Sequence, residues 1–146
     1  MYHLITEASF DSAHFLPGYI GKCSNLHGHR WRVVAEIEKD SLGAAGRLRG
    51  MVADFGDLKR DLNELTDSFD HALIIEEGSL KETTLMALRE EEFKVIEVPF
   101  RPTAEELARY FYICLAQKGY QIGRMTVYET PNNCAAYTKE EISCHV

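Results

Sequence analysis

Two histidines flank a single glycine in the segment CSNLHGH, residues 23–29. If this segment is extended, His27 and His29 point to the same face, because side chains alternate along a strand. His14 ends the preceding strand-like segment and would lie beside them if the two strands form a hairpin. Three histidines with no fourth protein ligand are typical of an open, catalytic zinc site, so Zn²⁺ is the expected cofactor.

Cys23 precedes His27 by four positions and allows three interpretations. It is a fourth ligand that closes a structural site, a small buried hydrophobic side chain, or a reactive thiolate that lies near the metal and acts as a base. Its segment contains glycine and a turn-prone Ser-Asn pair, which predicts a loop, and loops commonly carry function. The residues alone leave the first and third interpretations open.

Two further positions could move protons or bind a ligand. Asp70 and His71 follow a predicted helix, where they are either a solvated acid with a helix-end cation or a carboxylate that orients a catalytic imidazole. Glu129 follows an apolar strand, where it is either solvated or grips a planar N–H/NH₂ edge with two parallel hydrogen bonds.

The elements that must position these residues follow from the spacing of apolar side chains. Residues 2–15 and 29–39 are rich in β-branched and aromatic residues and predict two strands. The second strand alternates, so one face carries Trp31, Val33, Ala35 and Ile37. Two more short strands are predicted at RMTVYET and CAAYTK, near the end of the chain.

Two helices are predicted between these pairs of strands. Apolar residues recur every three or four positions from Phe55 to Phe69, with Asp54 as the N-cap. The segment 102–119 begins with Thr103 and Glu106 in the spacing of a capping box and ends at a glycine. Strands and helices in this order predict an α+β domain with an antiparallel sheet.

Length and composition favour a single domain over residues 1–146, with a formal net charge of −7. An acidic chain without a local basic patch is a poor candidate for binding nucleic acid or an anionic membrane. No apolar run approaches the ~18–20 residues that span a bilayer, and the first residues do not resemble a signal peptide. The four cysteines, Cys23, Cys114, Cys134 and Cys144, form no CxxC pair, so we expect reduced thiols in a cytoplasm.

Six segments in order, FDSAHFL, CSNLHGH, VADFGDLK, FDHALI, PTAEELA and VYET, resemble the 6-pyruvoyl-tetrahydropterin synthase superfamily. The Cys-x-x-x-His-Gly-His spacing is similar to its bacterial branch, the 6-carboxy-tetrahydropterin synthases of queuosine biosynthesis. The resemblance implies a tunnelling fold, with a four-stranded antiparallel sheet and two helices on one face. It also implies a homo-oligomer, a trimer or hexamer, with sites at subunit interfaces.

The resemblance further implies roles for the candidate residues. His14, His27 and His29 would bind zinc, and Cys23, Asp70 and His71 would form the proton-transfer set. Glu129 would hold a pterin ring, with Thr103 and Glu105 lining the pocket. The implied reaction is a lyase reaction that converts 7,8-dihydroneopterin triphosphate to 6-carboxy-5,6,7,8-tetrahydropterin, with release of triphosphate and acetaldehyde.

Three features depart from the family pattern. The stretch between His71 and Pro102 is longer than in compact members and predicts an extra helix and strand around 76–99. Glu106 stands where the family often has asparagine. The triphosphate has no clear site, and Lys22, Arg30 and Arg32 are its candidates.

Two alternatives remain. One is another pterin side-chain reaction on the same scaffold, either pyruvoyl formation or side-chain removal as in folate synthesis. Folate-type relatives carry glutamate in place of the cysteine, so Cys23 argues against the folate-type reaction. The other is a non-enzymatic, zinc-stabilised pterin-binding module, which a closed four-ligand site would favour.

Overall fold

The computed structural model describes residues 1–139, so Cys144 and His145 lie outside the described residues. Its sheet has six strands in the order β4-β3-β1-β2-β5-β6. The antiparallel part consists of β1 (Tyr2–His14), β2 (His27–Lys39), β5 (Ile122–Thr130) and β6 (Asn133–Tyr137). These are the four strands that the sequence predicts.

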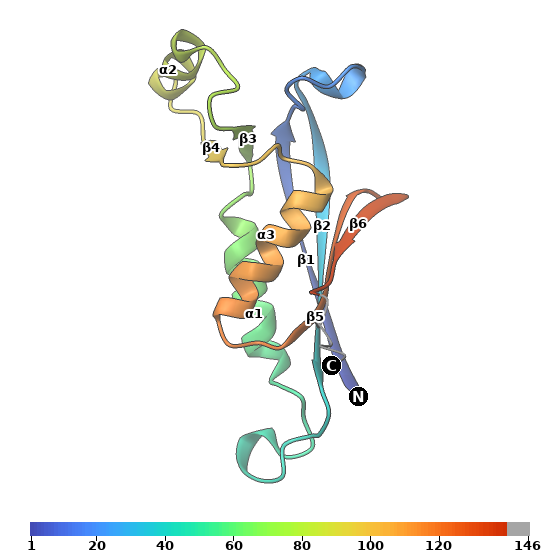
Figure 1. Cartoon of the computed structure of the whole chain (residues 1–146). Coiled ribbons are helices and arrows are strands. Elements are labelled where there is room, and N and C mark those ends of the chain that lie inside the picture. Colours follow the sequence, from blue (N-terminus) through green and yellow to red (C-terminus); the bar gives the residue numbers. More distant parts are fainter. Residues whose placement is uncertain (140–146) are drawn as a thin grey trace, which may run out of the picture.

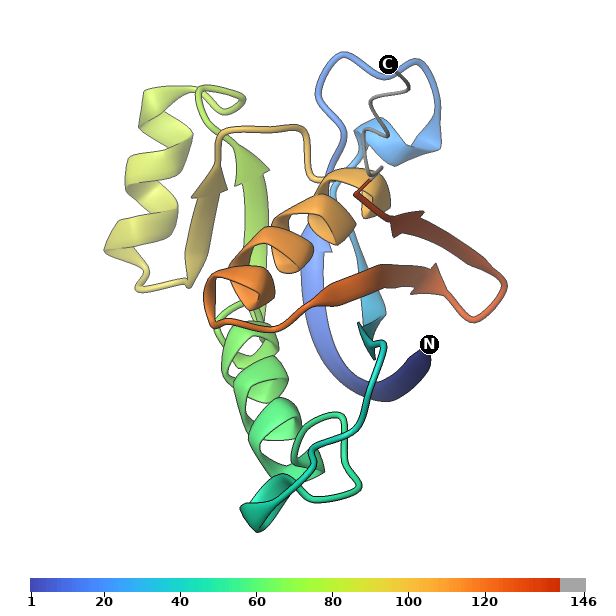
Figure 2. The same cartoon turned by 60° about the horizontal axis from the view of Figure 1, so that its bottom comes forward.

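The predicted sheet was too small, because two parallel strands extend it beyond β1. They are β3 (Ala72–Glu76) and β4 (Val95–Val98), and α2 (Glu82–Glu90) connects them. A crossover of this kind returns the chain in the same direction, which a tight hairpin does not allow. The extra helix and strand expected around 76–99 are therefore present, and the α+β sheet is mixed rather than purely antiparallel. Figure 2 shows α2 beside β4, away from the other two α-helices.

The hairpin of β1 and β2 brings the candidate metal ligands together. The register of the pair sets His14 directly opposite His27, and Ser12 opposite His29. The expectation that the end of the first strand returns to the start of the second is confirmed. The intervening loop carries a short 3₁₀ helix, η1 (Lys22–Ser24), and a second one, η2 (Gly46–Leu48), follows β2.

Helices α1 (Phe55–Asp67) and α3 (Ala104–Gln117) cover one face of the sheet, as Figure 1 shows. Both predicted N-caps are confirmed. The Asp54 carboxylate accepts hydrogen bonds from the Gly56 and Asp57 amides, and the Thr103 hydroxyl accepts one from the Glu106 amide. Only half of the capping box forms, because the Thr103 amide donates to the Arg101 carbonyl instead.

The core lies between these helices and the sheet. It contains the predicted inward face of β2, together with Phe10, Leu58, Leu62, Leu107, Phe111, Leu115 and Met125. Trp31 is fully buried beside the metal-ligand candidates, where its ring meets those of His14 and His29 edge to face. The hydrophobic core therefore forms one wall of the candidate site.

The opposite face of the sheet carries no helix within residues 1–139 (Figure 1). Cross-strand ion pairs link β1 to β2 on this face: Arg30 with Asp11, Arg32 with Glu7, and His3 with Glu36.

The three cysteines within residues 1–139, Cys23, Cys114 and Cys134, are free thiols. Within the same range, no helix has the length and apolar character needed to cross a membrane.

Candidate active site

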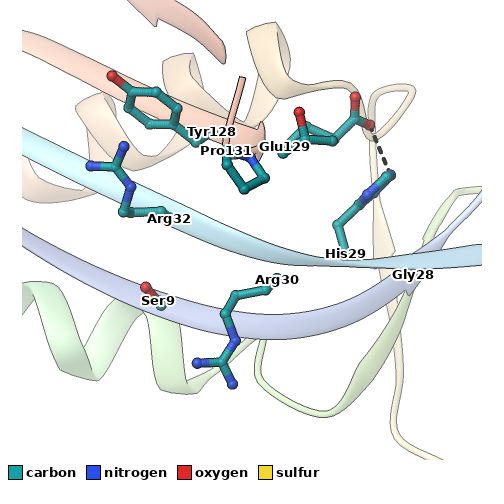
Figure 3. Close-up of a pocket in the computed structure, with 9 residues that line it drawn as sticks. Ser9, Gly28, His29, Arg30, Arg32, Tyr128, Glu129 and Pro131 are labelled. Carbon is teal, nitrogen blue, oxygen red and sulfur yellow. Dashed lines mark ion pairs between the residues drawn. The ribbon is translucent and has the colours of Figure 1, made fainter. Parts of the chain in front are cut away.

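Four side chains that can bind a metal converge at the end of the β1–β2 hairpin. They are His14, His27, His29 and Glu129, and one ligand atom from each lies within 4.8 Å of all the others. The Nε2 atoms of His14 and His27 are 3.1 Å apart. The Glu129 carboxylate oxygen lies 3.3 Å from Nε2 of His14 and 3.3 Å from Nε2 of His29. Figure 3 shows Glu129 and His29 pointing toward one another from β5 and β2.

Backbone carbonyls fix the orientation of two of these imidazoles. Nδ1 of His14 donates to the Pro102 carbonyl at 2.8 Å, and Nδ1 of His27 donates to the Asn25 carbonyl at 2.7 Å. A carbonyl oxygen can only accept, so both rings carry their proton on Nδ1 when neutral. Their Nε2 lone pairs then face each other, which is unfavourable unless a cation or a proton lies between them.

The residues present fit a zinc ion. Two imidazole nitrogens bound to tetrahedral zinc lie about 3.3 Å apart, close to the separations in this cluster. Nε2 of His29 is buried and makes no hydrogen bond within the described part of the chain. Buried polar atoms normally have a partner, and a bound metal ion would supply one here. Burial lowers the pKa of His14 and of His29 below the usual imidazole value, so both are neutral at pH 7 and ready to coordinate.

Cys23 lies outside this four-residue cluster. It lines an adjoining cavity of about 360 Å³, together with Thr103, Glu105 and Glu129. The amide of Leu16 donates to the Cys23 carbonyl at 2.9 Å, which ties the loop to the end of β1. Four residues singled out from the sequence thus share one cavity, and Glu129 belongs both to that cavity and to the metal cluster.

Asp70 and His71 form a close pair elsewhere on the surface. One carboxylate oxygen of Asp70 accepts from Nδ1 of His71 at 2.7 Å, and the other accepts from the Asp11 amide at 2.8 Å. Both hydrogen bonds lower the pKa of Asp70, and the one from the Asp11 amide has the largest effect. Asp70 therefore remains a carboxylate that can orient the imidazole. His71 lines an open hollow next to His29 and Arg30, and its side chain is 80% exposed.

Residues that the sequence interpretation did not single out hold this pair in place. The Asp11 carbonyl accepts from the His71 amide at 2.7 Å, and His71 adopts a left-handed φ of 53°. From the inserted segment, Lys94 Nζ donates to the Asp70 carbonyl at 3.0 Å, and the Lys94 carbonyl accepts from the Leu73 amide. Asp11 lies within the FDSAHFL segment, but no pattern of residue types indicated the role of its backbone.

The sequence-based triphosphate candidates Arg30 and Arg32 line a second cavity, of about 440 Å³, together with His29 and Glu129. Figure 3 shows Arg30 pointing away from the Glu129–His29 pair and Arg32 lying beside Tyr128. The guanidinium of Arg32 stacks 3.8 Å from the centre of the Tyr128 ring. Both arginines are also paired with carboxylates of β1.

Comparison with known proteins identifies the class to which this fold and site belong. A family model described as 6-pyruvoyl tetrahydropterin synthase matches residues 3–140, so the chain belongs to that family of pterin synthases. Within it, the chain is 38% identical to the 6-carboxy-5,6,7,8-tetrahydropterin synthase of Haemophilus influenzae, over 94% of this chain and 99% of the relative. It is 34% identical to the enzyme of the same name from Synechocystis, over 98% of each chain.

Solved structures show the same fold at lower sequence identity. An uncharacterised protein from Wolinella succinogenes superimposes with a TM-score of 0.77 at 20% identity, over 95% of this chain and 98% of the other. The 6-pyruvoyl tetrahydropterin synthase of Plasmodium vivax superimposes with a TM-score of 0.68, also at 20% identity, over 96% of this chain and 98% of the other. The α+β architecture of the family is therefore shared.

Proposed function

We propose that this protein is a zinc-dependent lyase that acts on 7,8-dihydroneopterin triphosphate. With one water molecule consumed, the products are 6-carboxy-5,6,7,8-tetrahydropterin, acetaldehyde and triphosphate. Relatives that carry the name 6-carboxy-5,6,7,8-tetrahydropterin synthase support this choice, with 30–38% identity over most of the chain. The Cys-x-x-x-His-Gly-His spacing supports the same branch.

The observation that carries the proposal is the position of Glu129. It joins the three-histidine cluster to a cavity that also contains Cys23, Thr103 and Glu105. At about 360 Å³ the cavity has the size of a small-molecule site. A ligand in this cavity would therefore lie between the thiol and the candidate metal ligands.

Different residues of the chain are proposed to bind the metal, to remove a proton and to relay protons. His14, His27 and His29 would hold the zinc ion, which when bound supplies Lewis-acid polarisation of the substrate's side-chain hydroxyls. Cys23, as thiolate, removes a carbon-bound proton from the side chain of the pterin. His71 relays or returns protons through Nε2, because Nδ1 is held by the Asp70 carboxylate.

Glu129 is proposed to hold the pterin ring through its 2-amino and N3 edge, with Thr103 and Glu105 lining the pocket. A carboxylate matches that planar edge with two parallel hydrogen bonds. Glu129 contacts His14 and His29 and also lines the cavity, with its side chain 30% exposed, so its carboxylate lies between the histidine cluster and the proposed ring site.

The proposed active enzyme is a homo-oligomer, a trimer or a hexamer, with sites shared between subunits. Within one chain, Cys23 lines one cavity whereas His71 lines a different and more open hollow. The strong exposure of His71 supports its contribution to a neighbouring subunit's site. On its side away from β2, β1 pairs with β3 only over Ser12–His14, and β6 ends the sheet, so both present strand edges for pairing between copies.

The proposed product suits a role in queuosine biosynthesis. The free thiols support a reducing compartment, the cytoplasm.

Mass spectrometry of the pterin product tests the reaction. The 6-carboxy product retains one side-chain carbon, whereas the pyruvoyl product of the alternative reaction retains all three. If zinc-loaded, assembled protein binds the pterin without consuming it, the chain is a binding module instead.

A further inference from the structure

Arg101 supplies the positive charge in the cavity that contains Cys23. Among residues 1–139, two of those that line this cavity carry carboxylates, Glu105 and Glu129, and one is a lysine or arginine, Arg101. We propose that Arg101 binds the phosphate chain of the pterin substrate. This inference rests on the proposed function and adds the residue that recognises the anionic part of the ligand.

Two hydrogen bonds to the carbonyls of Arg101 and Pro102 anchor the backbone at Arg101. The Arg101 carbonyl accepts a hydrogen bond from the Thr103 amide at 2.7 Å. The carbonyl of the next residue, Pro102, accepts from Nδ1 of His14 at 2.8 Å. Arg101 and Thr103 therefore line the cavity, Pro102 between them orients a candidate metal ligand, and Thr103 caps α3. This anchoring keeps the backbone that carries the Arg101 guanidinium next to the histidine cluster.

The charges in the cavity explain why an arginine is needed there. The carboxylates of Glu105 and Glu129 repel a polyanion, so a triphosphate requires compensation at short range. Arg101 makes no ion pair with any acidic side chain among residues 1–139, although Glu105 lines the same cavity. Its guanidinium can therefore take two phosphate oxygens through parallel N–H bonds without breaking an existing pair.

The two rival arginines, Arg30 and Arg32, are already paired with carboxylates. Arg30 contacts both carboxylate oxygens of Asp11, at 3.1 and 2.9 Å. Arg32 pairs with Glu7 at 2.8 Å and stacks on Tyr128. To bind a phosphate, either guanidinium would have to give up a carboxylate or share it. Arg101 is therefore a better triphosphate candidate than the arginines that the sequence pattern suggested.

Calorimetric titration of zinc-loaded protein tests this assignment, with Cys23→Ala present in every chain so that the substrate is bound but not consumed. The ligands are 7,8-dihydroneopterin triphosphate, unphosphorylated 7,8-dihydroneopterin and inorganic triphosphate. The test variant is Arg101→Gln, and Arg109→Gln is the matched control, because it removes one charge from an arginine that pairs with Glu106 on the same helix. A further variant, Arg30→Gln with Arg32→Gln, tests the rival site.

We expect Arg101→Gln to weaken binding of the triphosphate form about 10- to 100-fold, since a charged hydrogen-bond donor is lost. It should weaken inorganic triphosphate similarly and leave the unphosphorylated pterin within about twofold of the parent Cys23→Ala protein. The Arg109→Gln control should behave as that parent protein does. Unchanged affinity for the triphosphate ligands in Arg101→Gln, or a selective loss in the Arg30/Arg32 variant instead, overturns the assignment.

Failure of this inference and failure of the proposed function give different results. If the enzyme turns over the substrate but Arg101→Gln leaves its binding unchanged, the function holds and the role of Arg101 is wrong. If no turnover occurs, yet Arg101→Gln still abolishes the preference for phosphorylated over unphosphorylated pterin, Arg101 binds phosphate in a protein with another activity.

Discussion

The Pro102 carbonyl accepts a hydrogen bond from Nδ1 of His14 at 2.8 Å, across 88 positions of the chain. This contact joins the start of α3 to the candidate metal-binding cluster, and Pro102 and His14 are both buried. It fixes the His14 tautomer that leaves Nε2 free to coordinate, as carbonyls commonly do for metal-bound histidines. Movement of α3 would therefore disturb both the candidate ligand and the cavity wall.

The first prediction concerns the metal. Wild-type protein should contain one zinc ion per chain, and the double variant His27→Ala, His29→Ala should lose it, because two of the three imidazole ligands are gone. Elemental analysis of folded protein measures this. His3→Ala removes an imidazole that pairs with Glu36, outside the cluster, and should retain full zinc content. Full occupancy in the double variant would mean that the metal binds elsewhere.

The second prediction separates the two chemical roles considered for Cys23. Cys23 lies outside the candidate metal-binding cluster. If it is the base, Cys23→Ala should retain full zinc content and lose turnover. Zinc content and rate are measured on the same preparation. Cys114→Ala removes a thiol from α3 and serves as the control. A substantial loss of zinc from Cys23→Ala would make the thiol a ligand rather than the base.

The third prediction concerns Glu129. Glu129→Gln should keep the fold and the zinc but weaken pterin binding by about 2–3 kcal/mol, since an amide can accept only one of the two N–H bonds from the ring edge. Direct titration with a pterin measures the loss. If pterin affinity is unchanged while zinc affinity falls, Glu129 acts at the metal cluster and the ring is held by other residues.

The fourth prediction tests the support that the inserted segment gives to the proton-transfer pair. Lys94→Gln removes the ammonium group that holds the Asp70 carbonyl and should lower kcat by roughly tenfold, because small displacements of catalytic groups are costly. The zinc content and the KM for the pterin should stay near wild type. Lys118→Gln removes a lysine that pairs with Asp61 and Glu64 of α1 instead of with this turn, and is the control. Equal kcat values for the two variants would mean that Lys94 does not support the catalytic function of Asp70 and His71.

The fifth prediction concerns stability and pH. The Tyr120 hydroxyl donates to Asp61 at 2.7 Å; this bond is the main cause of the lowered pKa of Asp61, while burial and the same carboxylate raise the pKa of Tyr120 to about 12. Tyr120→Phe should reduce the free energy of unfolding at pH 7 by about 1 kcal/mol.

The sign of the pH effect follows from the lowered pKa of Asp61. A carboxylate with a lower pKa in the folded state stabilises the protein above its unfolded pKa of about 3.9 and loses that contribution as pH falls through the folded value. The difference between Tyr120→Phe and wild type should therefore be constant from pH 5 to 8 and shrink below about pH 4. Denaturant unfolding across this range measures it, and a difference that grows in acid would contradict the assignment.

Patterns of residue type were sufficient to predict the strands and helices that carry the cluster. The alternation in β2 identified Trp31 and Val33 as buried, and the placement of His14 at the end of the first strand correctly predicted its position opposite His27. These features depend on which side chains are apolar and how they are spaced, which a sequence displays directly.

Other features depend on backbone groups and on distant segments, which residue types do not reveal. Any residue offers a carbonyl, so nothing in the sequence marked those of Pro102 and Asp11 as partners of His14 and His71. The parallel pairing of β3 with β1 was missed because an apolar run such as ALIIE does not specify its neighbour or its direction. The separation of Cys23 from His71 within one chain likewise depends on three-dimensional packing.

The most direct test of the proposed lyase is the stoichiometry of its small products. Zinc-loaded, assembled protein is incubated with 7,8-dihydroneopterin triphosphate, and acetaldehyde, triphosphate and 6-carboxy-5,6,7,8-tetrahydropterin are quantified together. The proposed reaction requires that the three appear in equal amounts and that Cys23→Ala forms none of them. Triphosphate release without acetaldehyde would contradict the carboxy-forming reaction, and an unchanged substrate would contradict lyase activity itself.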